Sequence, residues 1–149
     1  MRPVIRKAET KDVESIALIE SECSGMPWTA EQIEEEISYS LAHNYVAEIE
    51  GKIVGFFSMH IVSDDAHLNE FGVTEMYRRQ GIGSMLAEKM IELCRENSCS
   101  VFSLEVREHS KPARNLYEKM GCVLTGVRKS FYSNPKEDAC IYIMSFEGE

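Results

Sequence analysis

The residues best suited to bind a ligand lie in a short basic turn that contains two glycines, Arg78-Arg79-Gln80-Gly81-Ile82-Gly83. Glycine gives the backbone unusual dihedral freedom and lets a ligand approach the main chain closely. An apolar-rich run at 66–73 precedes the turn and indicates a strand, and the apolar residues after it have helical spacing: Ile82, Leu86, Met90 and Leu93. Because a helix N-terminus carries partial positive charge, this order of strand, turn and helix predicts an anion-binding site.

The spacing of the turn excludes two other phosphate-binding turns. It lacks the third glycine of G-x-G-x-x-G, and it lacks the G-K-[ST] of a P-loop. When the turn is taken alone, a helix preceded by a flexible loop explains it equally well. The rest of the chain has to decide between these two interpretations.

Length and composition predict one domain that spans residues 1–149. Of the 149 residues, 44% are hydrophobic, which is enough for a core of its own. No apolar run approaches the roughly 18 residues of a bilayer-spanning helix, and the first residues lack the apolar region of a secretory signal. We therefore expect a cytoplasmic protein without a membrane partner. The five cysteines form no C-x-x-C pair and the four histidines no H-x-x-x-H pair, so we expect no disulfide framework and no metal.

The net charge of −9, from 25 acidic and 16 basic residues, constrains the partners. An acidic surface repels nucleic-acid phosphates and attracts cationic partners, so we expect no direct nucleic-acid contact. The charge has two explanations, which are solubility and the binding of a basic substrate. A polyanionic ligand would be repelled by the molecule as a whole, so a phosphate site needs local positive charge, which Arg78 and Arg79 would supply.

The patterns along the chain predict seven strands and four helices. We expect strands at 4–8, 44–50, 52–62, 66–73, 100–106, 123–131 and 139–146. A first helix should begin at Thr10 as its N-cap, and a second at the capping box of Thr29 and Gln32 and continue through Leu41. The third follows the glycine turn, and the fourth, at 113–120, should stop at Gly121. This order predicts a mixed α/β sheet with helices on its faces.

The turn and the segment downstream of it resemble one enzyme family. The turn matches the [QR]-x-x-G-x-[GA] pyrophosphate pattern of the GNAT N-acetyltransferases. The sequence Leu104-Glu105-Val106-Arg107, then Ser110, Ala113, Leu116-Tyr117 and Gly121, resembles the L-E-V-R-x-x-N-x-x-A-x-x-L-Y-x-x-x-G-F segment of GNAT enzymes that acetylate protein N-termini. The best match is the bacterial ribosomal-protein alanine N-acetyltransferases of the RimI type, which Pro27-Trp28-Thr29, Phe131-Tyr132 and Glu137-Asp138-Ala139 also resemble.

This resemblance covers nearly the whole chain and implies a fold and a co-substrate. It implies a single-domain GNAT fold, with a mixed central sheet of about six to seven strands flanked by about four helices. It also implies acetyl-CoA as the donor, with its pyrophosphate against the turn and its thioester beside the strand end at 71–73, where Gly72 leaves the approach uncrowded. The residues it nominates for binding are Phe71, Gly72, Val73, Arg78, Arg79, Gln80, Gly81, Ile82, Gly83, Ser84 and Ser110.

The resemblance also assigns acid–base roles, with Glu105 as general base and Tyr117 as general acid. Without it, Glu105 could be a strand carboxylate that faces solvent or pairs with Arg107, and Tyr117 could be an amphipathic core tyrosine. The chain departs from the family at Ser110, where the family has an asparagine that binds the cofactor, and at Cys122, where it has a phenylalanine. The first departure puts one cofactor contact in question, and the second affects core packing.

The resemblance implies acetylation of a basic protein N-terminus, the N-terminal alanine of a small-subunit ribosomal protein. An α-amine has a reference pKa of about 7.7–8.0, against about 10.4 for lysine, so less work is needed to expose its neutral form. Two alternatives stay open: acetylation of a small amine such as a polyamine or an antibiotic, and a non-catalytic module that binds acetyl-CoA. The presence of both Glu105 and Tyr117 argues against the non-catalytic module.

Overall fold

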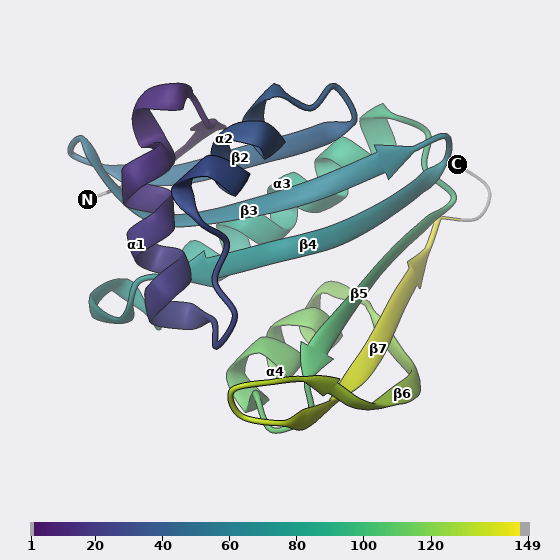
Figure 1. The fold of residues 1–149 in the computed structure, drawn as a ribbon. Coiled ribbons are helices and arrows are strands. Elements are labelled where there is room, and N and C mark those ends of the chain that lie inside the picture. The colour runs from purple at the N-terminus through teal and green to yellow at the C-terminus, as the bar shows by residue number, and fades with distance from the viewer. Residues whose placement is uncertain (1, 147–149) are drawn as a thin grey trace.

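The computed structural model describes residues 2–146, which form a seven-stranded mixed sheet with four α-helices (Figure 1). The strands are β1 (Val4–Lys7), β2 (Ala42–Ile49), β3 (Lys52–Val62), β4 (Asp65–Val73), β5 (Val101–Arg107), β6 (Val123–Tyr132) and β7 (Glu137–Ser145). The helices are α1 (Val13–Cys23), α2 (Ala30–Ser38), α3 (Ile82–Glu96) and α4 (Lys111–Met120), with short 3-10 turns at Thr10–Asp12 and Glu75–Tyr77. The predicted mixed sheet and four helices are confirmed. No helix in this part of the chain is long and apolar enough to cross a membrane.

The sheet divides into two parts at its centre. The strand order is β1-β2-β3-β4-β5-β7-β6, and every neighbouring pair is antiparallel except β4 and β5. These two strands pair only from Asp65 with Val101 to His67 with Ser103. Beyond that point they diverge, so that the sheet opens between β4 and β5 (Figure 1). The edge of β4 from Phe71 to Val73 is left without a strand neighbour on the side of β5.

The two faces of the sheet carry different helices. Helices α1 and α2 cover one face of β2–β4, and α3 lies behind the same strands (Figure 1). The α1 face has a small core that includes Ile16, Ile33 and Phe56, whereas the opposite face has the larger core, into which α3 buries Leu86 and Met90. Because α4 supplies Tyr117 to the larger core, α3 and α4 share a face.

A bulge in β4 determines which way its last residues face. Met59 pairs with Leu68 and Ser58 pairs with Glu70, so Asn69 is the extra residue. Downstream of it, Glu70 and Gly72 face α1, whereas Phe71 packs on the larger core and its ring lies 6.3 Å from that of Tyr117. The bulge therefore gives the end of β4 a polar side and an apolar side.

Several element boundaries differ from the prediction, and α4 and β7 each begin two residues earlier than predicted, at Lys111 and Glu137. Thr10 is not an N-cap, because residues 10–12 form a 3-10 turn whose cap is Glu9 and whose Asp12 accepts the Glu9 N–H at 2.8 Å. Helix α2 starts at its predicted capping box but ends at Ser38, so the expected continuation through Leu41 is wrong. The amide of Asn44 donates to the carbonyl of Glu36 and ends the helix, and β2 starts two residues earlier than predicted.

Candidate active site

A cavity of about 480 Å³ occupies the gap between β4 and β5. Its walls are the end of α1 with the segment that follows it, the second half of β4, β5, the start of α4 and the end of β6. Glu105 and Tyr117 both line it, although they reach it from opposite faces of the sheet. Alternation along β5 places Leu104 and Val106 in the core of the α3 face and Glu105 on the α1 face.

The predicted anion site is the start of α3. Gly81 is the N-cap residue with φ of +83°, and Arg79 also has positive φ, +64°. The first backbone hydrogen bond of the helix runs from the N–H of Met85 to the carbonyl of Gly81. The N–H groups of Ile82, Gly83 and Ser84 are therefore not used within the helix. The start of α3 can thus donate several hydrogen bonds to a phosphate.

The side chains of the turn differ in how well they are placed to contact an anion. Ile82 is buried in the core, so only its backbone can meet a ligand. The Arg78 guanidinium donates to the carbonyl of Val73 at 3.0 Å and lies 3.3 Å from the sulfur of Cys23, which holds the turn to the end of β4. Gln80 donates to the carbonyl of Met76 at 3.3 Å. Arg79 is exposed at the turn and is the better placed of the two arginines to meet an approaching anion.

Gly72 makes room for a helix. A Cβ at this position would lie 3.1 Å from both Cys23 Sγ and Ile19 Cγ2 of α1. Close packing of α1 on β4 is therefore a structural reason for this glycine, and its role in an uncrowded approach for the ligand stays a prediction. A Cβ on Gly83 would lie 3.5 Å from Leu116 and Phe71, an ordinary contact, so this glycine lies where α3 meets α4 and β4.

Both carboxylate oxygens of Glu105 have partners. His67 Nε2 lies 3.1 Å from Oε1, and an Arg128 nitrogen lies 3.6 Å from Oε2. His67 makes a second contact through Nδ1, 2.9 Å from the hydroxyl of Ser103. Arg107 does not pair with Glu105. The carboxylate is thus oriented within the cavity but remains 20% exposed, so that it can exchange protons with a ligand or a water.

Tyr117 lies deep in the cavity wall and is 4% exposed. Its ring contacts those of Phe71 and Tyr142 at 6.3 Å between centroids. Burial raises the pKa of Tyr117 above its usual value, with a smaller contribution from Tyr132 nearby. A phenol with a raised pKa keeps its proton at neutral pH, which a general acid requires.

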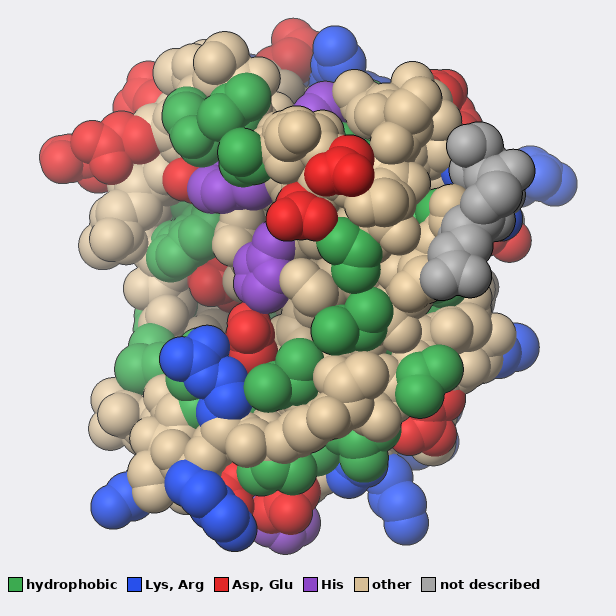
Figure 2. All heavy atoms as spheres, turned by 90° about the vertical axis from the view of Figure 1, so that its right-hand side faces the viewer, with side chains coloured by type: hydrophobic (Ala, Val, Ile, Leu, Met, Phe, Trp, Pro, Cys, Tyr) green, Lys and Arg blue, Asp and Glu red, His purple; other side chains and the backbone are tan. Residues whose placement is uncertain are grey.

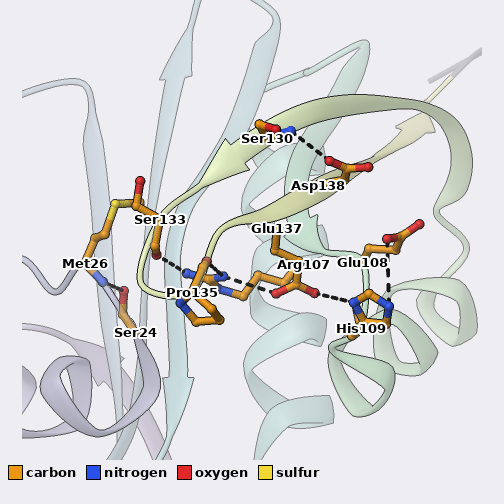
Figure 3. A network of polar contacts seen from close by, with 10 residues as sticks. All are labelled: Ser24, Met26, Arg107, Glu108, His109, Ser130, Ser133, Pro135, Glu137 and Asp138. Carbon is orange, nitrogen blue, oxygen red and sulfur yellow. Dashed lines mark hydrogen bonds and ion pairs between the residues drawn. The ribbon is translucent and has the colours of Figure 1, made fainter.

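A polar network fixes the end of β5 and the loop between β6 and β7 (Figure 3). Arg107 donates to the carbonyls of Ser133 and Pro135, both at 2.7 Å, and pairs with Glu137 at 3.1 Å. Glu137 also accepts the backbone N–H of His109 at 2.7 Å, which is the main reason that its pKa is lowered. Ser110 follows at the N-cap of α4 and lines the cavity, without a side-chain capping bond.

The loop between β6 and β7 packs closely against the segment after α1. A Cβ on Gly25 would lie 2.0 Å from the carbonyl oxygen of Asn134, a separation that only glycine permits. Figure 3 shows Met26 and Ser133 at this junction. The segment after α1 and the end of β6 therefore both contribute to the cavity wall, through Met26 and Tyr132 among others.

Two carboxylates in the cavity were missed by the sequence reasoning. Glu20 ends the buried stripe of α1 with 1% exposure, and Glu70 faces it from β4. Burial raises the pKa of both carboxyls, and the negative charge of Glu20 raises that of Glu70 further. The sequence does carry a signal for Glu20: this glutamate stands at a core position of an amphipathic helix, where a charged side chain is rarely buried without a partner.

An open mixed sheet, a helix start free to bind phosphate and a cavity lined by a carboxylate and a phenol together define the class of the N-acetyltransferases. The model of the Acetyltransferase (GNAT) family matches residues 13–122, and the chain belongs to this family. The resemblance stated from the motifs is thereby confirmed. The chain is an acetyl-CoA-dependent N-acetyltransferase.

Individual relatives and a solved structure show which N-acetyltransferases the chain is similar to. The chain is 33% identical to a Bacillus subtilis (strain 168) protein provisionally named [ribosomal protein bS18]-alanine N-acetyltransferase, over 94% of this chain and 93% of that one. It is 30% identical to the [ribosomal protein bS18]-alanine N-acetyltransferase of Escherichia coli (strain K12), over 92% and 93%. The crystal structure of the ribosomal-protein-S18-alanine N-acetyltransferase from Escherichia coli superposes with a TM-score of 0.87 at 27% identity, over 99% and 98%.

Proposed function

We propose that this chain, as one domain, transfers the acetyl group of acetyl-CoA to the N-terminal α-amine of a protein, the N-terminal alanine of ribosomal protein bS18. The relatives named for this reaction support the choice of acceptor, because they match the chain over nearly its whole length. Since ribosomal proteins are made in the cytoplasm, the proposed place of action is cytoplasmic. No observation on the chain favours a small amine or a non-catalytic role.

The observation that carries the proposal is that the cavity joins two chemically different faces of the sheet. On the α3 face are the N–H groups at the start of α3 and the phenol of Tyr117. On the α1 face is the carboxylate of Glu105. Acetyl-CoA would therefore lie on the α3 face along the open edge of β4, and the acceptor amine would enter from the α1 face.

The donor would be held chiefly by backbone groups. The N–H groups of residues 79–84 would surround the pyrophosphate, and the helix dipole adds to their attraction for negative charge. Arg79 supplies local positive charge on a molecule whose net charge is −9. The unpaired edge of β4 at 71–73 would bind the pantetheine arm and offer a backbone N–H to the thioester oxygen, as in an oxyanion hole. Ser110 would contact the donor from the start of α4.

Two proton transfers complete the reaction. Glu105, directly or through a water, would accept the proton that the α-ammonium must lose to become a nucleophile. The neutral nitrogen attacks the thioester carbonyl, the C–S bond breaks, and the thiolate takes a proton from Tyr117. The nitrogen then gives its remaining extra proton to the Tyr117 phenolate, and Glu105 releases the proton that it accepted to solvent. Both side chains are thereby restored, and the overall products are an acetylated amine, CoA and one proton.

The proposal is tested by peptide mapping of a protein acceptor. Purified bS18 with a free N-terminal alanine is incubated with acetyl-CoA and this enzyme, then digested and analysed by mass spectrometry. We expect an added acetyl group on the N-terminal peptide and none on internal lysines. Acetylation at lysines only, or no acetylation, would refute the proposed acceptor.

A further inference from the structure

His67 is the last residue of β4 that pairs with β5 before the two strands part, and its partner there is Ser103. Its neighbours Ala66 and Leu68 belong to the larger core, so alternation along the strand places the imidazole on the α1 face, in the wall of the cavity. Glu105 is two residues beyond Ser103 on β5 and therefore shares this face. The parting of the strands thus brings one imidazole beside a hydroxyl and a carboxylate.

Both ring nitrogens of His67 have a partner. Nδ1 lies 2.9 Å from the hydroxyl oxygen of Ser103, and Nε2 lies 3.1 Å from Oε1 of Glu105. An ionised carboxylate can only accept hydrogen bonds, so Nε2 must carry a proton, and in the neutral ring Nδ1 then accepts from the Ser103 hydroxyl. Ser103 therefore favours the tautomer of His67 that donates to Glu105.

The two carboxylate oxygens of Glu105 are held differently. Oε1 lies within reach of the Nε2–H of His67, whereas the nitrogen of Arg128 lies 3.6 Å from Oε2, beyond hydrogen-bond distance, on a side chain that is 54% exposed. We propose that His67 is a positioning residue for the acetyl transfer. Its Nε2–H fixes Glu105 through Oε1, so that Oε2 stays available to take the proton of the acceptor ammonium. This inference rests on the proposed function, which makes Glu105 the base.

A second histidine on the same face provides a matched comparison. His60 is the pairing partner of His67 on β3, and residues directly opposite each other share a face of the sheet. Its Nε2 contacts Glu36 of α2, not Glu105. The side chains of His60 and His67 are 28% and 38% exposed, so neither contributes much buried area. A substitution at His60 therefore removes a similar side chain without touching the proposed base.

The first test measures steady-state kinetics at pH 7 with acetyl-CoA and an alanine-initiated basic peptide. His67→Leu removes the donor and should lower kcat roughly 10–100-fold, as expected for the loss of a hydrogen bond to a charged group, with little change in the KM of either substrate. His67→Gln places an amide N–H near the position of Nε2 and should restore kcat to within about threefold of wild type. His60→Leu should keep the wild-type kcat. A histidine with a merely structural role would not be rescued by glutamine in this way.

A double-mutant cycle asks whether His67 acts through Glu105. In a Glu105→Gln background no carboxylate remains to be positioned, so His67→Leu should cost less than about twofold in kcat. In a Glu14→Gln background, which removes an exposed carboxylate of α1, the loss should keep its full size. Circular dichroism checks that each variant is folded. Wild-type kcat in His67→Leu, no rescue by His67→Gln, or an equal loss in the Glu105→Gln background would overturn the proposal.

Nitrogen NMR of the imidazole rings provides a readout that needs no acceptor. At pH 8 the ring of His67, assigned by the signals missing from His67→Gln, should carry a proton on Nε2 and none on Nδ1. If this tautomer is found but the wild-type enzyme acetylates no α-amine, the arrangement of His67 stands and the proposed function is wrong. If the α-amine is acetylated but the proton is on Nδ1, the positioning role is wrong and the function stands.

Discussion

At the scale of single residues, the carboxyl groups that line the cavity differ in their neighbours. Glu105 has a histidine and an arginine within ion-pair distance, so its charged form is compensated. Glu70 has another carboxyl beside it and is desolvated, so its protonated form is favoured. Because a carboxyl that keeps its proton cannot accept another, Glu70 is the poorer candidate for the base, and we propose Glu105 for proton removal.

Glu105→Gln should lower kcat/KM at pH 7 by about 10²–10⁴-fold, because the amide cannot accept a proton. The loss should shrink above about pH 9, where an α-amine with a reference pKa of about 7.7–8.0 is already neutral. Steady-state kinetics with an alanine-initiated peptide at both pH values measure this, and Glu14→Gln serves as the control. Equal losses at the two pH values would show that Glu105 does not act as the base.

Tyr117→Phe should slow turnover by a factor in the same range and leave the affinity for acetyl-CoA nearly unchanged, because the ring contacts remain. Since the pKa of Tyr117 is raised, its phenol should stay protonated well above neutral pH. No alkaline decline in kcat is therefore expected from it below about pH 10. Tyr45→Phe, at another buried tyrosine, is the control. Wild-type turnover in Tyr117→Phe would remove this residue from the mechanism.

At the scale of the elements, the proposed donor site depends on the start of α3 and on the parting of β4 from β5. The helix start exposes unused N–H groups, and the parting leaves the edge of β4 open. Neither feature is sufficient alone, because a phosphate site without an open strand edge would hold the nucleotide but not position the thioester.

Gly81→Val should weaken acetyl-CoA binding tenfold or more, because a branched side chain would stand where the pyrophosphate meets the backbone. Gly51→Val is a closely matched control. The two glycines have φ of +83° and +81°, and a Cβ on either would meet nothing within 4 Å. Each substitution should cost at least about 1–2 kcal/mol of stability from the left-handed backbone conformation. Calorimetry that shows equal acetyl-CoA affinity for the two variants would contradict the assignment of the turn.

The elements also show what sequence can predict. The third helix and its turn follow from local spacing, and the capping box of Thr29 correctly starts α2. The end of α2 was missed because it depends on Asn44, a residue of the next strand. The Glu20–Glu70 pair was missed for a similar reason: two residues 50 positions apart meet only because a bulge turns Glu70 toward α1. Motif matching nominated Glu105 and Tyr117, which both line the cavity in the structure, but the partners of Glu105 could not be predicted without the pairing of β4 with β5.

At the scale of the whole molecule, the net charge of −9 bears on how a basic acceptor would approach. Figure 2 shows one face on which acidic and histidine side chains lie near the centre, while most lysines and arginines lie toward the rim. A basic acceptor would be attracted to such a surface, and the attraction would weaken with salt. Under the proposed function, the exposed charge would therefore favour encounter with a basic peptide.

The buried carboxyl pair should also make stability depend on pH. Because the pKa of Glu70 is higher in the folded chain than its ordinary value of 4.5, its favourable contribution is complete below that value and is lost as pH rises toward the raised pKa. Glu70→Gln should therefore gain melting temperature relative to wild type between pH 5 and pH 8, by roughly 2–4 °C for each 1 kcal/mol removed. Thermal unfolding without ligands measures this. A constant difference across that range would mean that Glu70 does not titrate with folding.

The central claim is that an α-amine of a basic peptide is the acceptor, and one competition measures it directly. Equal concentrations of an alanine-initiated basic peptide, the same lysine-containing peptide with a blocked N-terminus, and spermidine are mixed with limiting acetyl-CoA, and initial products are counted by mass spectrometry. We expect nearly all label on the free N-terminus, because the higher pKa of lysine and polyamine nitrogens leaves far less neutral amine at pH 7. Preferential acetylation of spermidine or of the blocked peptide would contradict the account.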